Sequence, residues 1–262
     1  MLKYEERTYR DWVKHDDLVT VRVVEEETDL LISGIIDLKK QAERSVSYYR
    51  NQIKDYISKD HKFSVALKPI DVAQDAPEIV KDMANASYMA GVGPMSAVAG
   101  AIAEFVARDL TLLSDQLIIE NGGDNFIKSS VPRIVGIYAG KSPFTGRLGI
   151  QIEPDQTPLG VCTSSGTVGH SLSFGRADAV IILSKWTALA DAVATATGNI
   201  VKTEDDIKKG IDFARFIDGV EGVVIIVGSK IGIWGNINLV KTENENSCHF
   251  TFSNTADLSQ KI

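Results

Sequence analysis

Two periodicities in the placement of apolar residues divide the chain into predicted strands and helices. Val19, Val21 and Val23 alternate with Thr20 and Arg22, and this two-residue period is typical of a strand with one buried face. Strands are predicted at 4–13, 18–24, 28–33, 116–120, 134–138, 148–152, 176–183, 223–227 and 231–239. The first three would open the chain as an antiparallel meander, and the last two would form a closing hairpin.

Helices are predicted where apolar residues recur every three or four positions. These segments are 37–58, 75–90, 96–106, 185–199 and 204–216. Asp75 is expected to cap the second helix, with Pro77 early in its first turn, and Gly198 is expected to close the fourth. The segment 96–106 is almost entirely small or apolar, which predicts a buried helix.

The mixture of strands and helices predicts an α+β fold, with antiparallel-rich sheets covered by helices. No repeat or proline- or serine-rich linker divides the chain. We therefore expect a single domain over 1–262, with two closely packed lobes at about 1–150 and 151–240 and a C-terminal extension at 241–262. A chain of 262 residues with 44% hydrophobic and 24% charged residues has ample material for such a core.

Charge and composition exclude several classes of partner. The net charge is −7, and the basic residues form no concentrated stripe, so nucleic acid is not expected as a main partner. The first residues lack the apolar core of a signal peptide, and no apolar run reaches membrane-spanning length. Two cysteines are too few for a disulfide framework. The expected location is the reducing cytoplasm, away from membranes.

The stretch 160–175 holds four glycines, seven hydroxyl or thiol side chains, one histidine and no formal charge. Glycines let a backbone approach a ligand closely, and hydroxyls and N–H groups donate to anions. A ligand-facing turn is one interpretation and a plain polar loop is the other. The candidate donors are Thr163, Ser164, Ser165, Gly166 and Thr167. His170 is the nearest candidate acid or base, because the ordinary pKa of histidine is close to neutral.

Two further glycine turns are candidates for binding a phosphate or nucleotide. Gly93 precedes the buried helix, whose N-terminal N–H groups could hold an anion, although a structural turn explains it equally. Asn121, Gly122, Gly123 and Asp124 form a tight-turn sequence typical of a hairpin, and Glu120 and Asp124 could alternatively flank a cation or a ribose. The Gly-Lys-Ser at 140–142 lacks the upstream glycine of a phosphate loop, and no helix pattern follows it.

Asp191 and Thr195 stand four residues apart in a predicted helix, so their oxygens project from one face. One carboxylate and one hydroxyl, completed by carbonyls and water, form a plausible site for Mg²⁺ or Ca²⁺. The alternative is that Thr195 bonds back to a helix carbonyl while Asp191 meets solvent.

Four segments, 92–100, 120–124, 160–175 and 190–195, together resemble an ApbE-like branch of archaeal and bacterial proteins, over about 29–240. The resemblance implies an ApbE/T-fold-like α+β fold. The wider ApbE superfamily consists of FAD-binding, magnesium-dependent enzymes that transfer FMN onto a threonine or serine of a target protein. Gly122–Gly123 resembles the family's Gly-Gly turn, and Ser164–Gly166 resembles its Thr-Ser-Gly element. Ala190, Asp191 and Thr195 resemble its metal-binding helix motif, and the backbone of Val98–Gly100 would lie nearby.

The resemblance also implies functions other than flavin transfer. The transferases carry His-x-x-Asp-Pro-x-Thr-Gly, whereas 170–175 here lacks the acidic residue and the proline. The branch is associated with homocysteine formation from sulfide, which implies an accessory role beside a partner enzyme of sulfur metabolism. Cys162 could then present sulfur if nearby N–H groups lower its pKa, or it could be a small buried hydrophobe. We expect a small-molecule ligand, FAD or another nucleotide with Mg²⁺, and a homo-oligomer.

Overall fold

The computed structural model describes residue 10 and the ranges 16–167 and 174–242. Within them, strands form an eight-stranded antiparallel sheet in the order β1-β2-β3-β4-β7-β8-β9-β10 and a three-stranded sheet in the order β11-β6-β5. The strands are β1 (Val19–Glu25), β2 (Thr28–Gly34), β3 (Leu117–Asn121), β4 (Asp124–Lys128), β5 (Arg133–Gly136), β6 (Leu148–Ile152), β7 (Leu159–Ser164), β8 (Ala179–Ser184), β9 (Val220–Val227), β10 (Lys230–Gly235) and β11 (Asn238–Lys241).

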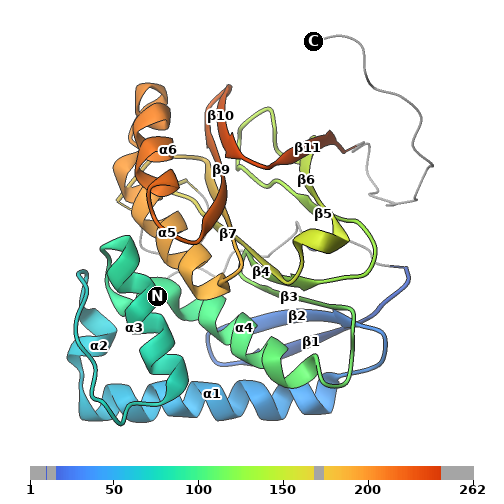
Figure 1. Ribbon diagram of the computed structural model, residues 1–262, viewed down its shortest axis with the longest axis vertical. Helices are drawn as coiled ribbons and strands as arrows, with labels where there is room; N and C mark the ends of the chain where they lie inside the picture. Colours follow the sequence, from blue (N-terminus) through green and yellow to red (C-terminus); the bar gives the residue numbers. More distant parts are fainter. Residues whose placement is uncertain (1–9, 11–15, 168–173, 243–262) are drawn as a thin grey trace.

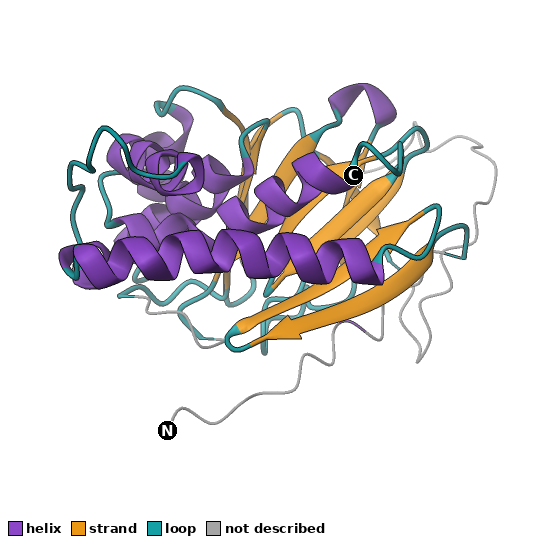
Figure 2. Cartoon of the chain, turned by 90° about the horizontal axis from the view of Figure 1, so that it is seen from below, coloured by secondary structure: helices purple, strands orange, loops and turns teal. Residues whose placement is uncertain are grey.

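Helices cover one face of the large sheet, and the small sheet packs on its other face (Figure 1 and Figure 2). The α-helices are α1 (Lys39–Lys59), α2 (Lys62–Val65), α3 (Glu78–Ala90), α4 (Val98–Leu110), α5 (Thr187–Ile200) and α6 (Ile207–Arg215). The short 3₁₀ helices are η2 (Pro94–Ala97), η3 (Pro154–Gln156) and η4 (Glu204–Asp206). The predicted α+β fold with helix-covered antiparallel sheets is confirmed.

The two faces of the large sheet belong to two separate hydrophobic cores. Val180 and Ile182 of β8 pack in the helical core, whereas Ile181 and Leu183 pack in the core shared with the small sheet. Because successive strand residues point to opposite faces, a strand buried on both sides is apolar throughout. The large sheet contains strands from both predicted lobes, and the division into lobes stays a prediction.

The periodic segments were predicted well, but some of their ends were wrong. The alternating strands at 18–24 and 28–33 correspond to β1 and β2, and the helix at 37–58 corresponds to α1. Asp75 does not cap α3, which begins at Glu78 after Pro77; no side chain caps it. Proline disfavours helical geometry in the residue before it, so the helix starts later. Gly198 lies buried inside α5 instead of ending it.

The predicted closing strand at 231–239 is two strands in different sheets. β10 ends at Gly235, whose φ of 94° is a left-handed conformation that glycine adopts readily. β11 then pairs with β6 in the small sheet. Of the predicted strand at 4–13, all but Arg10 lies outside the described residues, as does the extension from 243 onward.

Within the described ranges, no single helix is long and apolar enough to cross a membrane. Glu78–Ala90 and Pro94–Leu110 reach that length and hydropathy only as a pair, bent by 103° at the break between them.

Candidate functional site

The β3–β4 hairpin carries two polar side chains that reach different neighbours. Gly122 and Gly123 form its turn, with φ values of 69° and 105° that suit glycine. Before the turn, Asn121 Nδ2 donates to the carbonyl of Ala99 in α4 at 3.0 Å. After it, Asp124 Oδ1 accepts the N–H of Thr163 in β7 at 3.2 Å. The hairpin therefore joins the start of α4 to the end of β7.

Helices α4 and α5 meet at a contact that requires glycine. Asp191 Oδ2 accepts the N–H of Gly100, in the first turn of α4, at 2.9 Å. A Cβ atom at Gly100 would lie 2.5 Å from the carbonyl oxygen of Thr187 and 2.9 Å from Asp191 Cβ. A helix N-terminus has unpaired N–H groups and a partial positive charge, so it stabilises a carboxylate from the neighbouring helix. Gly100 thus fixes Asp191 beside the hairpin.

Two buried carboxyl groups interact at this junction. Burial raises the pKa of Asp191 to about 7, although N–H groups of Gly100 and Ala99 oppose the shift. Burial, and after it the charge of Asp191, raises the pKa of Asp124 well above its ordinary value. No ion pair within the described residues neutralises either group. A proton on one carboxyl relieves their mutual repulsion, and a bound cation would relieve it in the same way.

The donor chemistry fits a hard cation such as Mg²⁺. Thr195 lies one helical turn beyond Asp191 and is half-buried. Among the described residues, no group of three or more histidine, cysteine, aspartate or glutamate side chains forms a metal site. A cation here would therefore need the Thr195 hydroxyl, backbone carbonyls or water beside the carboxylate, all of which are oxygen donors that Mg²⁺ accepts.

Cys162 lies beneath this junction with its side chain fully buried. Its Sγ donates to the carbonyl of Thr187 at 3.4 Å. Burial, and next the charges of Asp124 and Asp191, raise the pKa of the thiol well above its ordinary value. Reactive cysteines need electropositive and accessible surroundings. The geometry therefore favours the buried-hydrophobe interpretation of Cys162 over a sulfur-presenting thiol.

The first residues of the glycine-rich stretch form a strand and not a turn. Residues 160–164 belong to β7, which pairs with β4 and β8, so the expected turn does not begin at Gly160. Gly160 is needed for packing, because a Cβ there would lie 2.6 Å from Thr187 Cα. Ser164, the last residue of β7, is buried. A run of glycine and hydroxyl residues resembles a loop locally, but pairing on both sides makes it a strand.

The segment that follows β7 is held by hydrogen bonds to the two residues that precede β8. Gly166 N donates to the carbonyl of Ala177 at 2.9 Å, and Thr167 Oγ1 donates to Asp178 Oδ1 at 2.9 Å. Thr167 N also donates to Ser165 Oγ at 3.1 Å. Gly166 and Thr167 are exposed and Ser165 is half-buried. His170 lies outside the described residues, so its predicted role stays a prediction.

Gly93 contacts a different part of the chain. A Cβ atom there would lie 1.7 Å from the carbonyl oxygen of Ala66, so the residue must be glycine for the two backbones to cross. This packing accounts for Gly93 without a ligand. The described contacts therefore bring together Asn121, Asp124, Cys162, Thr163 and Asp191, while Gly93 packs beside the end of α2.

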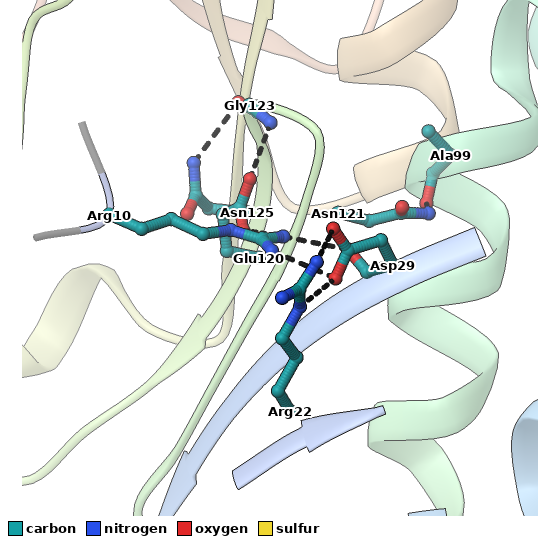
Figure 3. A network of polar contacts seen from close by, with 8 residues as sticks. All are labelled: Arg10, Arg22, Asp29, Ala99, Glu120, Asn121, Gly123 and Asn125. Carbon is teal, nitrogen blue, oxygen red and sulfur yellow. Dashed lines mark hydrogen bonds and ion pairs between the residues drawn. The ribbon is translucent and has the colours of Figure 1, made fainter. Parts of the chain in front are cut away.

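Sequence reasoning missed an arginine–carboxylate network beside the hairpin (Figure 3). Arg10 donates to Asp29 Oδ1 at 2.8 Å and to Glu120 Oε2 at 2.5 Å. Glu120 Oε1 in turn accepts the N–H of Gly123 at 2.8 Å. Arg10 and Glu120 are 110 residues apart, so no local pattern signals their contact.

A second missed cluster fixes the start of α5. Glu104 Oε2 accepts the N–H of Thr187 at 2.7 Å, and its other oxygen pairs with Arg108 at 2.7 Å. Trp186 Nε1 donates to Asp82 at 2.8 Å. These contacts anchor the first residues of α5 on α3 and α4, and Asp191 follows one turn later.

Comparisons with known proteins agree with this architecture. A family model described as AbpE bacteria matches residues 10–215. A UPF0280 protein of Methanocaldococcus jannaschii is 42% identical over 231 residues, which cover 85% of this chain and 93% of that protein. A UPF0280 protein of Methanothrix thermoacetophila is 44% identical over 190 residues, covering 72% and 79% respectively.

Solved structures share the fold at low sequence identity. The flavin transferase ApbE from Vibrio cholerae aligns with a TM-score of 0.56 and 14% identity, covering 83% of this chain and 96% of that one. The apo form of the Pseudomonas stutzeri flavinyl transferase ApbE aligns with a TM-score of 0.55 and 14% identity, covering 83% and 93%. At this identity the likeness shows the fold alone, and the expected ApbE-like fold is confirmed.

Proposed function

The chain belongs to the AbpE bacteria family, and on that premise we propose that it binds a phosphate-containing ligand, a flavin or another nucleotide, together with a divalent cation. The cation would lie where the β3–β4 hairpin, the end of β7, the start of α4 and the second turn of α5 converge. Asp191 and Thr195 would hold it. A bound Mg²⁺ would supply electrostatic stabilisation of phosphate oxygens.

The observation that carries this proposal is the buried carboxyl pair. The groups that act most strongly on Asp124, apart from burial itself, are the carboxyls of Asp191 and Glu120, the Thr163 N–H and the Cys162 thiol. Two buried acids that repel each other are costly to a fold unless another group compensates them. A divalent cation compensates both acids at once.

The phosphate side of the proposal rests on two turns at one end of the large sheet. β3 ends at Asn121, β4 begins at Asp124 and β7 ends at Ser164, and these antiparallel neighbours place both turns at the same end. The Gly122–Gly123 turn and the Ser165–Thr167 segment carry N–H and hydroxyl groups of the kind that bind anions. Several of these donors are bonded within the chain, so a phosphate would replace some of those bonds. The named activity of the solved relatives, flavin transfer, makes FAD the first ligand to test.

Thermal unfolding of metal-stripped protein tests the proposal. Mg²⁺ together with FAD or ADP should raise Tm more than Mg²⁺ or the nucleotide alone, because the cation would bind both the carboxylate and the phosphate. A ligand at one hundred times its Kd stabilises the folded state by about 2.7 kcal/mol. Asp191→Ala should lose this shift. Asp55→Ala is the matched control, because Asp55 is an exposed helical aspartate on α1 and should keep the shift. No shift for any ligand, or an equal shift in Asp191→Ala, would contradict the proposal.

A further inference from the structure

Arg10 joins two strands of the large sheet through buried ion pairs. Its guanidinium uses three nitrogens: Nη1 on Asp29 Oδ1 at 2.8 Å, Nη2 on the Asp29 carbonyl at 2.7 Å and Nε on Glu120 Oε2 at 2.5 Å. The side chains of Arg10, Asp29 and Glu120 are 11%, 7% and 12% exposed. A planar guanidinium holds its N–H donors in a fixed fork that fits both carboxylates at once, a geometry that a lysine ammonium does not reproduce.

Glu120 connects the ion pair with Arg10 to the hairpin turn. While Oε2 pairs with Arg10, Oε1 accepts the Gly123 N–H at 2.8 Å. The turn consists of two glycines with positive φ, which have little conformational preference of their own. The carboxylate of Glu120 therefore holds the turn, and the guanidinium of Arg10 holds the carboxylate.

The two residues that flank this turn are the ones that build the candidate site. Asn121 bonds to Ala99 at the start of α4, and Asp124 bonds to Thr163 at the end of β7. The charge of Glu120 also raises the pKa of Asp124, so the two carboxyls are close enough to repel. Arg10 counters that repulsion by drawing the Glu120 charge into an ion pair (Figure 3).

We propose that Arg10 is a positioning residue for the cation and phosphate site, acting through Glu120 and the Gly123 N–H to fix the hairpin that presents Asn121 and Asp124. This inference rests on the proposed function. It extends the site to a residue that precedes β1 and touches neither the cation-binding helix nor β7 in the described contacts.

Arg22 provides a control in the same network. It also pairs with Asp29, through Nε at 2.8 Å and Nη2 at 2.9 Å, and its side chain is 54% exposed. Arg22→Gln therefore removes an ion pair from Asp29 but leaves the link from Arg10 to Glu120 and Gly123. In Arg10→Gln, Asp29 keeps Arg22, while Glu120 loses Arg10.

The test measures the Kd of full-length protein for Mg²⁺ and for ADP by titration calorimetry, and follows the Gly123 amide by ¹⁵N NMR. Arg10→Gln should weaken binding by about tenfold to a hundredfold, as is typical when a residue that orients a metal ligand is replaced. The same substitution should shift the Gly123 amide resonance and speed the exchange of its amide hydrogen with water. Arg22→Gln should leave both unchanged. Arg10→Lys keeps the charge but not the planar fork, so binding should stay weakened.

The outcomes separate this inference from the proposed function. If wild-type protein binds Mg²⁺ and ADP while Arg10→Gln binds them equally well with an unchanged Gly123 amide, the positioning role fails and the proposed function stands. If wild-type protein binds neither, both fail. Should Arg10→Gln not fold, Glu120→Gln interrupts the same link at its middle member and should produce the same loss of binding.

Discussion

Helix α5 meets buried carboxyl groups in two places, and the two places differ in how their charge is balanced. At its start, Glu104 accepts the Thr187 N–H and pairs with Arg108. One turn later, Asp191 accepts the Gly100 N–H and faces Asp124, without an ion pair among the described residues. The first arrangement is complete within the chain and stabilises the fold. The second has no ion-pair partner among the described residues, and the proposed ligand site rests on this difference.

The largest expected effect on stability comes from disrupting the close contact of Gly100 in α4 with Thr187 and Asp191 in α5. Gly100→Ala would put a methyl group 2.5 Å from the Thr187 carbonyl and 2.9 Å from Asp191 Cβ. We expect the free energy of unfolding, measured in urea, to fall by about 3 kcal/mol. Gly136→Ala is the control, because a Cβ there meets nothing within 4 Å. Equal stability of the two variants would show that α4 and α5 can separate without cost.

Neutralising Glu104 at the start of α5 and neutralising Asp124 beside Asp191 should change the free energy of unfolding of metal-free protein in opposite directions. Glu104→Gln removes a charge from a satisfied pair, so the free energy of unfolding should fall by about 2 kcal/mol. Asp124→Asn keeps an acceptor for the Thr163 N–H but relieves repulsion by Asp191, so the same quantity should rise by about 1 kcal/mol.

Added Mg²⁺ should distinguish the Asp124 and Glu104 variants further by their free energies of unfolding. It should stabilise wild-type protein more than Asp124→Asn, and it should stabilise Glu104→Gln as much as wild type. Chemical unfolding of the three proteins, each with and without the metal, measures these free energies of unfolding. A fall in stability for Asp124→Asn without metal would mean that the pair is already compensated, and the comparison between the two places would lose its basis.

The smallest effect concerns Asp82, which belongs to the satisfied cluster at the start of α5. Burial raises the pKa of Asp82 from 3.8 to about 6, against the hydrogen bond from Trp186. The folded protein therefore holds this proton more tightly than the unfolded chain, so the contribution of Asp82 to stability is greatest below about pH 4 and falls as the pH rises through about 6. Asp82→Asn should reduce that fall by about 1 kcal/mol, measured by urea unfolding from pH 4.5 to 7. An unchanged pH profile would assign the dependence to other groups.

The sequence predicts elements well where a local pattern decides the structure. Alternating valines mark β1, and the three-and-four spacing marks α1. It fails where distant contacts decide. Residues 160–164 are rich in glycine and hydroxyls, yet pairing with β4 and β8 makes them a buried strand. The 231–239 segment is apolar enough for one strand, but the left-handed turn at Gly235 sends its end to another sheet.

In the candidate site, too, residues with a local sequence signal were predicted and residues that act through distant contacts were not. Asp191, Asn121 and Asp124 were predicted from turn chemistry, helix spacing and family resemblance, and the structure brings them together. Arg10 and Glu104 gave no local signal, because each acts on a residue more than eighty positions away. Gly93 shows an ambiguity that the sequence leaves open, because a glycine required for two backbones to cross resembles one required by a phosphate.

The division of the last apolar segment at Gly235 also sets an order of assembly during synthesis. All eight strands of the large sheet have been synthesised once residue 235 has been added to the chain. The outer strand β11, which supplies Leu239 to the second core, exists only when residues 238–241 have been added. The second core therefore cannot close before the last strand of the large sheet has been synthesised.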